Sequence, residues 1–226
     1  MPAAEGDGPL VAWITSTDVP EPGPAWSALS SLHGQTGLVP VLLDGQADEA
    51  HYFYGQPADV AEIDRLDAVA FLAGRWEEYA RFPGLAPCSD GELSRAERDA
   101  VLASLPPARI GLVPAQRPAD VPAIVGWSAF GLEPYPWVQV SSNAVWVAAV
   151  LRTFEDRFRA TLLHLDQCSE LHLLIDGPPG DLGHATRIAA ELSVFGDEWG
   201  GGPGLREVSE TAAALVAAPV WRFWWD

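Results

Sequence analysis

The chain has 226 residues, enough for one large domain or two small ones, and a formal net charge of −18. Its thirteen cationic side chains are all arginine, which excludes a lysine Schiff base and the lysine of a phosphate-binding P-loop. Nucleic acids and anionic membranes are polyanionic, so we expect neither as a partner. A basic protein remains an open alternative.

Cysteine usage and the first residues predict where the protein is found. The two cysteines, Cys88 and Cys168, stand in no Cys-x-x-Cys pair, so we expect no metal centre and no cofactor. The first residues lack the basic region and apolar run of a secretory signal. No apolar run reaches the ~18 residues of a membrane span. We therefore expect a cytoplasmic protein with reduced thiols.

The N-terminal part combines short apolar runs with stretches in which apolar residues recur every three to four positions. These patterns predict strands over 9–16 and 38–43 and helices over about 24–34, 59–81 and 92–104. Gly37 is placed to end the first helix. The double proline Pro106-Pro107 is the best candidate for a boundary between two parts of the chain.

The C-terminal part has a regular order of predicted elements. They are strands over 109–113, 160–166, 170–176 and 220–225, with helices over 144–159, from Asp181 to Phe195, and over 205–216. Asn143 is a plausible N-cap for the first of these helices, and residues 114–140 are expected to be irregular. The order strand, helix, strand, strand, helix, short helix, strand is that of a ferredoxin-like, split βαβ sheet.

The predicted fold class is therefore α+β. Residues 1–107 form an N-terminal αβ extension, and residues 108–226 form the C-terminal domain with the ferredoxin-like sheet. We expect the two parts to pack closely, and neither shows an internal repeat.

Several C-terminal segments occur together in a known family. They are Leu112-Val113-Pro114-Ala115, Arg117-Pro118-Ala119-Asp120-Val121-Pro122-Ala123, Gly126-Trp127, Glu155-Asp156-Arg157-Phe158, Gly177-Pro178-Pro179 and the terminal Trp221-Arg222-Phe223-Trp224-Trp225-Asp226. This set resembles the bacterial domain-of-unknown-function family 4253, over about residues 110–226. The resemblance implies a family and no activity. The chain departs from the usual pattern at Phe154, where the family more often has Trp, and at Arg159, where Gly is usual.

Two adjacent carboxylates, Glu155 and Asp156, are candidates for a general acid and base. Arg152 lies four residues before Asp156, and Arg159 lies four residues after Glu155. Both spacings are typical of ion pairs on one helix surface. The favoured interpretation is therefore a salt-bridged helix face, and the catalytic one stays open.

Two histidines lie on neighbouring predicted strands. Period-two alternation places His164 and Asp166 on one face of the sheet, and cross-strand pairing can bring His172 close to them. With Cys168 in the turn, a metal or Cys/His site is conceivable, yet no spacing typical of zinc ligands is present. Packing and surface roles are the favoured interpretation.

Arginine and tryptophan side chains in loops and on the last strand are candidates for an interface. Arg117 can pair with Asp120 to fix its loop, near Trp127. On the last strand, Trp221, Phe223 and Trp225 alternate with Arg222 and Trp224. Because both sides of that strand are apolar, we expect it inside the sheet or covered on both faces, with an open aromatic face as the alternative. The candidate binding residues are Arg117, Asp120, Trp127, Glu155, Asp156, Arg157, Trp221 and Trp224.

Three functions are consistent with these residues. The first is a non-enzymatic, acidic protein-binding or accessory module, for example an immunity-like protein that neutralises a basic partner. The second is a hydrolase or transferase that uses Glu155 and Asp156 with His164 and His172. The third is a structural subunit of a larger assembly. A deep pocket where the ionisable residues converge would favour the enzyme, whereas ion pairs spread over a convex face would favour the module.

Overall fold

The computed structural model describes residues 12–44, 57–76, 84–127, 140–166, 170–195 and 205–225. Its strands are β1 (Trp13–Ile14), β2 (Leu38–Leu43), β3 (Arg109–Pro114), β4 (Ala160–Leu165), β5 (Glu170–Ile175) and β6 (Val220–Trp224). Its helices are α1 (Pro22–Ser31), α2 (His33–Thr36), α3 (Val60–Ile63), α4 (Ala68–Trp76), α5 (Arg95–Ala103), α6 (Val121–Val125), α7 (Asn143–Phe158), α8 (Leu182–Phe195) and α9 (Leu205–Leu215), with a 3₁₀ turn η2 (Pro118–Asp120). The α+β class is confirmed. Within these ranges, no helix is long and apolar enough to cross a membrane.

All six strands belong to one mixed sheet in the order β1-β3-β2-β4-β5-β6. Strand β2 is antiparallel to β3 and parallel to β4, where only Leu42 and Leu43 find register partners. Apart from this pair, neighbouring strands are antiparallel. The sheet therefore joins its two halves through one short parallel ladder.

The strand order corrects the expected ferredoxin-like arrangement. A split βαβ unit needs parallel strands on either side of an antiparallel one, whereas β3 and β4 run in opposite directions with β2 between them. The physical reason lies in the sequence of β2, Leu-Val-Pro-Val-Leu-Leu, of which all but Leu38 is buried. An apolar run of this kind is typical of a strand covered on both faces, so β2 takes a central place. The division of the chain into 1–107 and 108–226 stays a prediction, but both parts contribute strands to this sheet.

Local chemistry explains where most elements begin and end. Gly37, with a φ of 68°, ends α2, because glycine tolerates the left-handed region; the one helix expected over about 24–34 is instead the two helices α1 and α2. A capping box between Ser94 and Glu97 starts α5. The single helix expected over 59–81 is instead two helices, because Asp59 caps α3 and Asp67 accepts backbone hydrogen bonds at the start of α4. Residues 114–140 were expected to be irregular, but η2 and α6 lie within their described part, and residues 128–139 lie outside the described residues.

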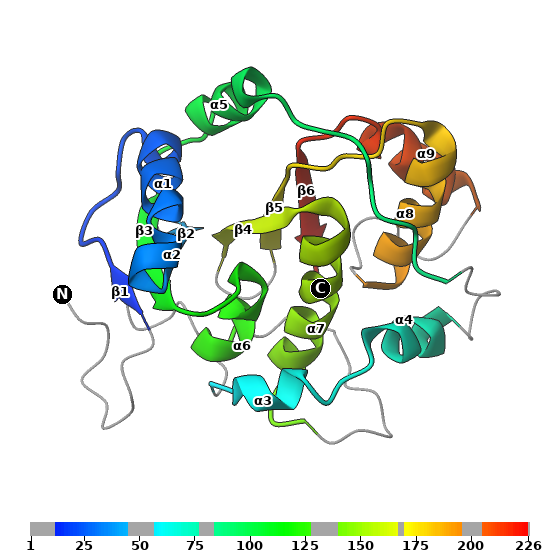
Figure 1. Ribbon diagram of the computed structural model, residues 1–226, viewed down its shortest axis with the longest axis horizontal. Coiled ribbons are helices and arrows are strands. Elements are labelled where there is room, and N and C mark those ends of the chain that lie inside the picture. The colour runs from blue at the N-terminus through cyan, green and yellow to red at the C-terminus, as the bar shows by residue number, and fades with distance from the viewer. Residues whose placement is uncertain are drawn as a thin grey trace.

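Helices cover both faces of the sheet (Figure 1). One face packs against α7 and α8 and holds a large aromatic cluster, made of Phe154, Phe158, Phe195, Trp221, Phe223 and Trp225. The other face packs α1 and α5 over a smaller cluster around Trp26, Leu42 and Leu163. In Figure 1, α1 and α2 lie beside β1–β3, α7 lies near the middle, and α8 and α9 lie on the opposite side.

The last strand packs as expected on one side and differs on the other. Trp221 and Phe223 are buried in the aromatic cluster, which confirms the core role of that side. However, β6 is the end strand of the sheet among the described residues, not an internal strand. Its Arg222 is exposed and its Trp224 is half-buried on the opposite face.

Candidate functional site

Helix α7 carries three of the candidate residues, Glu155, Asp156 and Arg157, and its two sides differ in character. Ser142, not Asn143 as expected, is its N-cap and accepts a hydrogen bond from the Ala144 backbone N–H. The inner side of α7 packs on the sheet through residues such as Phe154 and Phe158. Its outer side therefore presents the ionisable residues between them.

Arg152 of α7 links two other elements. Its guanidinium donates two hydrogen bonds to Asp120 of η2, from Nε to Oδ1 at 2.6 Å and from Nη2 to Oδ2 at 3.0 Å. Its Nη1 donates to Asp64 Oδ1 at 2.6 Å, at the end of α3. Asp120 is only 1% exposed, so this paired guanidinium supplies the charge that makes its burial tolerable. The hydrogen bond to Asp120, and secondarily that to Asp64, raises the pKa of Arg152 above its usual value.

Arg117 holds the next turn of α7. Its Nε donates to Glu155 Oε1 at 3.2 Å, and its Nη2 donates to Asp156 Oδ1 at 2.5 Å. Burial raises the pKa of Glu155, while Arg117 and the Ala119 backbone N–H oppose that rise. Glu155 therefore titrates above an ordinary glutamate even though a guanidinium lies beside it.

These contacts correct the expected pairing. Arg117 pairs with Glu155 and Asp156 and not with Asp120, while Arg152 pairs with Asp120 and Asp64 and not with Asp156. Arg159 lies past the end of α7 in the left-handed region, with φ of 50°, and donates to backbone carbonyls instead of Glu155. The left-handed conformation turns its side chain out of the helical row, so the i,i+4 pair cannot form.

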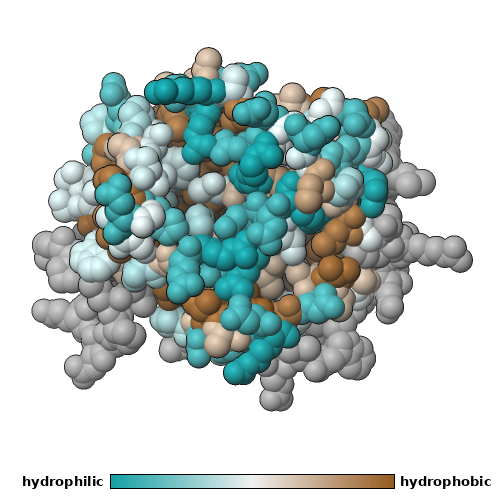
Figure 2. Space-filling model, viewed as in Figure 1, coloured by the Kyte–Doolittle hydropathy of each residue, from teal (hydrophilic) through white to brown (hydrophobic). Residues whose placement is uncertain are grey.

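An acidic surface continues from α7 onto α3. Glu62 accepts a hydrogen bond from the Ser141 backbone N–H at 2.9 Å, just before α7 begins, and this bond lowers the pKa of Glu62. We call the surface formed by these two elements, η2 and the start of α4 the acidic face. Its carboxylates are Asp59, Glu62, Asp64, Asp67, Glu155 and Asp156, and its arginines are Arg65, Arg117 and Arg152. Six negative charges against three positive ones leave the acidic face negative, and buried Asp120 adds one more. Figure 2 shows hydrophilic side chains through the middle of this view, from α5 towards α3.

Arg157 lies away from the acidic face, although it was predicted with it. Its side chain is 10% exposed, and its guanidinium makes two hydrogen bonds to Glu191 of α8, at 3.0 Å and 2.7 Å. It also lies over the rings of Phe154 and Phe158, a cation–π arrangement. Sequence reasoning missed Glu191, which is fully buried. The signal was present, because Glu191 is three residues after Ile188 and so falls on the buried stripe of α8.

The predicted tryptophans belong mainly to the core. Trp127 is fully buried, packs edge-on against Trp225, and donates from Nε1 to the Asp166 carbonyl at 3.0 Å. Trp221 is also fully buried. Neither side chain can therefore meet a partner at the surface. Trp224 is half-buried and stays a candidate contact residue.

The two histidines lie side by side on neighbouring strands, as the sequence predicted. His164 and His172 are cross-strand partners, and their ring centroids are 4.7 Å apart. Each ring is hydrogen-bonded to one carboxylate, His164 to Asp44 at 3.0 Å and His172 to Glu170 at 2.5 Å. Burial lowers the pKa of His172 despite Glu170, and neighbouring His164 and Arg222 add to that effect. The hydrogen bond with His164 lowers the pKa of Asp44.

The histidines do not join Glu155 and Asp156. Along β4 and β5, His164 and His172 alternate with Leu165, Leu171 and Leu173, which pack into the α7 side of the core. The imidazoles therefore face the opposite side of the sheet from α7. Among the described residues, no group of three or more histidine, cysteine or acidic side chains is placed to hold a metal ion, and Cys168 lies outside those residues.

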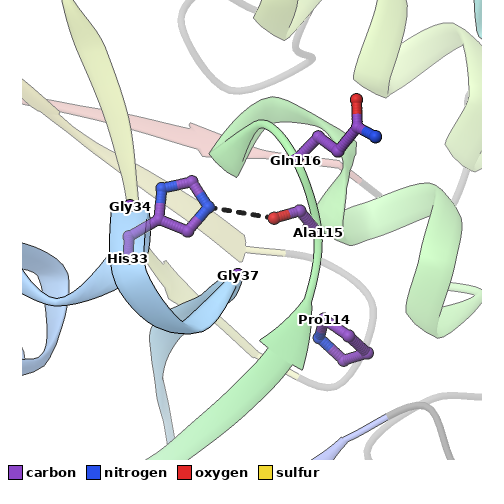
Figure 3. A pocket seen from close by; sticks show the side chains of 6 residues that line it. All are labelled: His33, Gly34, Gly37, Pro114, Ala115 and Gln116. Atoms are coloured by element: carbon purple, nitrogen blue, oxygen red, sulfur yellow. Dashed lines mark hydrogen bonds between the residues drawn. The ribbon is translucent and has the colours of Figure 1, made fainter.

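Two of the hollows among the described residues are lined by other side chains. One, of about 460 Å³, is wide open and lies between α2 and the end of β3. Figure 3 shows His33 there, hydrogen-bonded through Nε2 to the Ala115 carbonyl at 2.9 Å, with Gln116 turned away from it. The other lies between α1 and α5. Neither is lined by the acidic face or by the histidine pair.

The fold and the site together define an α+β protein whose mixed sheet carries helices on both faces and an acidic surface over α3 and α7. The chain belongs to the family described as Domain of unknown function (DUF4253), which matches residues 109–226. The resemblance expected from its C-terminal segments is thereby confirmed. No curated protein and no solved structure matches the chain.

Proposed function

We propose that this protein is a non-enzymatic binding module whose acidic face holds a basic surface of a partner protein. The observation that carries the proposal is that many of the arginines are already paired with carboxylates of the same chain. At least six of the thirteen, Arg95, Arg98, Arg109, Arg117, Arg152 and Arg157, form ion pairs within the chain. The negative charge in excess of these pairs is available to attract a cationic partner over a Debye length.

The state of the candidate catalytic residues supports the module over the enzyme. Glu155 and Asp156 share Arg117 on the outside of a helix. A general acid or base needs access to a bound substrate in a concave site. The four residues of the hydrolase or transferase alternative lie on two sides of one sheet, so they do not form a common site. The structural-subunit alternative stays a prediction.

The proposal extends to the nature and place of the complex. The partner is a protein rich in arginine and lysine on one surface, and an immunity-like neutralisation of a basic toxin is one concrete case. We propose that the complex forms in the cytoplasm. Because exposed charges are screened by salt, association should be fast at low ionic strength and weaken as salt rises.

Two matched variants of the full chain test the proposal. The first, Asp59→Asn, Glu62→Gln and Asp67→Asn, removes three charges from the acidic face. It keeps side chains that can accept the helix-start hydrogen bonds made by Asp59 and Asp67. The second, Glu21→Gln, Asp90→Asn and Glu92→Gln, removes three exposed charges elsewhere. Both change the net charge equally, so a general charge effect cannot distinguish them.

The measurement is co-purification from the native host with tagged wild type and both variants, at low and high salt. We expect a basic protein that is retained by the wild type and the second variant and lost from the first. Its release by salt should be gradual. A complex that resists salt, or one that both variants retain or lose equally, would contradict the proposal.

A further inference from the structure

Residues 84–93, which we call the strap, run between α4 and α5 without helix or strand structure. The strap is nevertheless held along its length by hydrogen bonds that its backbone N–H groups donate and its backbone carbonyls accept. Seven backbone groups take part: Leu85 O, Ala86 N, Ala86 O, Pro87 O, Ser89 N, Gly91 O and Leu93 N. Every partner lies within the family domain, on the end of α7, on the connection from β5 to α8, or on α8.

A buried charged pair forms the centre of this contact. Glu191 accepts a hydrogen bond from the Ala86 backbone N–H, and Arg157 Nη1 donates to the Ala86 carbonyl at 2.9 Å. The same two side chains bond to each other. Taking a carboxylate out of water is unfavourable by several kcal/mol unless it is paired and hydrogen-bonded. Here both members of the pair are directed at the two backbone groups of one strap residue, so this contact recognises the main chain of the strap.

The strap also meets strict side-chain requirements at three positions. Ala86 is 2% exposed, so only a small side chain fits. Ser89 donates from Oγ to the Pro178 carbonyl at 2.8 Å and accepts from the Gly91 N–H at 3.1 Å. A Cβ at Gly91 would lie 2.0 Å from the Pro178 carbonyl oxygen. The side chains of Pro87, Cys88 and Asp90 are exposed. The contact therefore selects the pattern small-x-x-Ser-x-Gly in an extended chain.

We propose that the end of α7, the β5–α8 connection and α8 form a peptide-binding groove of the family domain, in which the strap is the ligand bound in cis. The partner that fits the groove is an extended protein segment with the small-x-x-Ser-x-Gly pattern, which binds when the strap is displaced. This site is separate from the acidic face, and its test is independent of the proposed function. A tethered ligand has an effective concentration of about 1 mM, so the strap hides the groove in the wild-type chain.

The test opens the groove in the full chain and supplies the ligand in trans. The double variant Ala86→Asp and Gly91→Ala places a carboxylate against Glu191 and a methyl group against the Pro178 carbonyl, so its strap should leave the groove. The probe is a synthetic peptide of residues 84–93 with blocked ends and a fluorescent label. A control peptide carries the same two substitutions.

The readouts are fluorescence anisotropy and the melting temperature of the protein. We expect the probe to bind the opened variant at least about tenfold more tightly than the wild type, and to raise the melting temperature of the variant, because a ligand that binds only the folded state stabilises it. The control peptide should do neither. Glu191→Gln in the opened variant should weaken binding of the probe.

Two outcomes would overturn the proposal. One is a folded opened variant that binds the probe no better than it binds the control peptide. If the double variant does not fold, Ser89→Ala replaces it, since this change removes only two hydrogen bonds of the strap. In that case the proposal is contradicted if adding the probe does not change the melting temperature of the Ser89→Ala variant.

Discussion

The two faces of the sheet are built from the same strands but carry different side chains, aromatic on one face and partly ionisable on the other. On the α7 face, strands β5 and β6 contribute to a continuous aromatic cluster with Phe154 and Phe195. On the other face, the small cluster under α1 and α5 gives way to a row of His164, His172 and Arg222, in register across β4, β5 and β6. Successive side chains along a strand point to opposite faces, so core residues and ionisable residues follow one another in the sequence. The first face should determine stability, and the second should determine how stability depends on pH.

Removing strand β2 should abolish both faces at once. This strand supplies Val41 and Leu43 to the aromatic face and Leu42 to the other, and it lies between β3 and β4. A chain of residues 109–226 contains the whole family match but would leave β3 and β4 without their shared neighbour. We expect circular dichroism and urea titration to show no cooperative unfolding. A cooperative transition in this fragment would mean that the sheet order is not needed for folding.

Removing one aromatic ring should show how much the α7 face contributes to the free energy of unfolding. Phe154 is fully buried against Phe195, Trp221 and Phe223. Phe154→Ala should lower the free energy of unfolding by about 3–5 kcal/mol, because a large cavity is left behind. The control Val69→Ala alters an exposed apolar residue and should change it by less than about 0.5 kcal/mol. Equal effects of the two substitutions in urea denaturation would contradict this assignment.

The outer side of α7 should depend strongly on the Arg152 guanidinium. Arg152→Ala leaves Asp120 buried without its partner, which should cost about 3 kcal/mol of stability. As a control, Arg95→Ala breaks a pair between exposed Arg95 and Asp99 and should have little effect. Restoring stability in the double variant Arg152→Ala, Asp120→Ala would identify the orphaned charge as the cause. A double variant no more stable than Arg152→Ala would point to lost packing instead.

The histidine row should give the smallest effect, visible only as a change with pH. Burial lowers the folded-state pKa of His172, so the unfolded chain binds the proton more readily, with a pKa near 6.5. The free energy of unfolding should therefore fall as the pH drops through about 6.5 and below. His172→Phe should remove this part of the slope. The loss of stability near and below pH ~4, to which the lowered pKa of Asp44 contributes, should remain.

An unchanged slope between neutral and mildly acidic pH in His172→Phe would contradict the role of this ring. The groups that face it come from three strands: His164 of β4, Glu170 of its own strand and Arg222 of β6. Arg222→Gln is therefore a useful comparison, because removing that positive charge should make protonation of His172 easier and the slope smaller.

Local patterns predicted more of the fold than of the site. The apolar runs of β2, β4 and β5 and the helical periods of α7 and α8 lie where the sequence placed them, because each depends on neighbours within a few residues. The contact between His164 and His172 was also predictable, since only Asp166 to Ser169 separate the two strands in the sequence and neighbouring antiparallel strands bring such residues opposite one another.

The charge pairs were not predictable in the same way. Arg152 has a carboxylate four residues away, yet it pairs with Asp64 and Asp120, which lie 88 and 32 residues away. Several partners are sterically reachable, and only the packing of α3 and η2 on α7 decides among them. The strap is a stronger example, because its order depends on Arg157 and Glu191 rather than on any local period.

The central claim is that charge concentrated on the acidic face, and not charge in general, binds a basic partner. Its most direct test is titration of the wild type and the two matched triple variants with a fluorescent oligo-arginine peptide at low and physiological salt. We expect the acidic-face variant, Asp59→Asn, Glu62→Gln and Asp67→Asn, to bind about tenfold more weakly than Glu21→Gln, Asp90→Asn and Glu92→Gln, which should match the wild type. Equal weakening of both variants would show that only net charge matters and would contradict the claim.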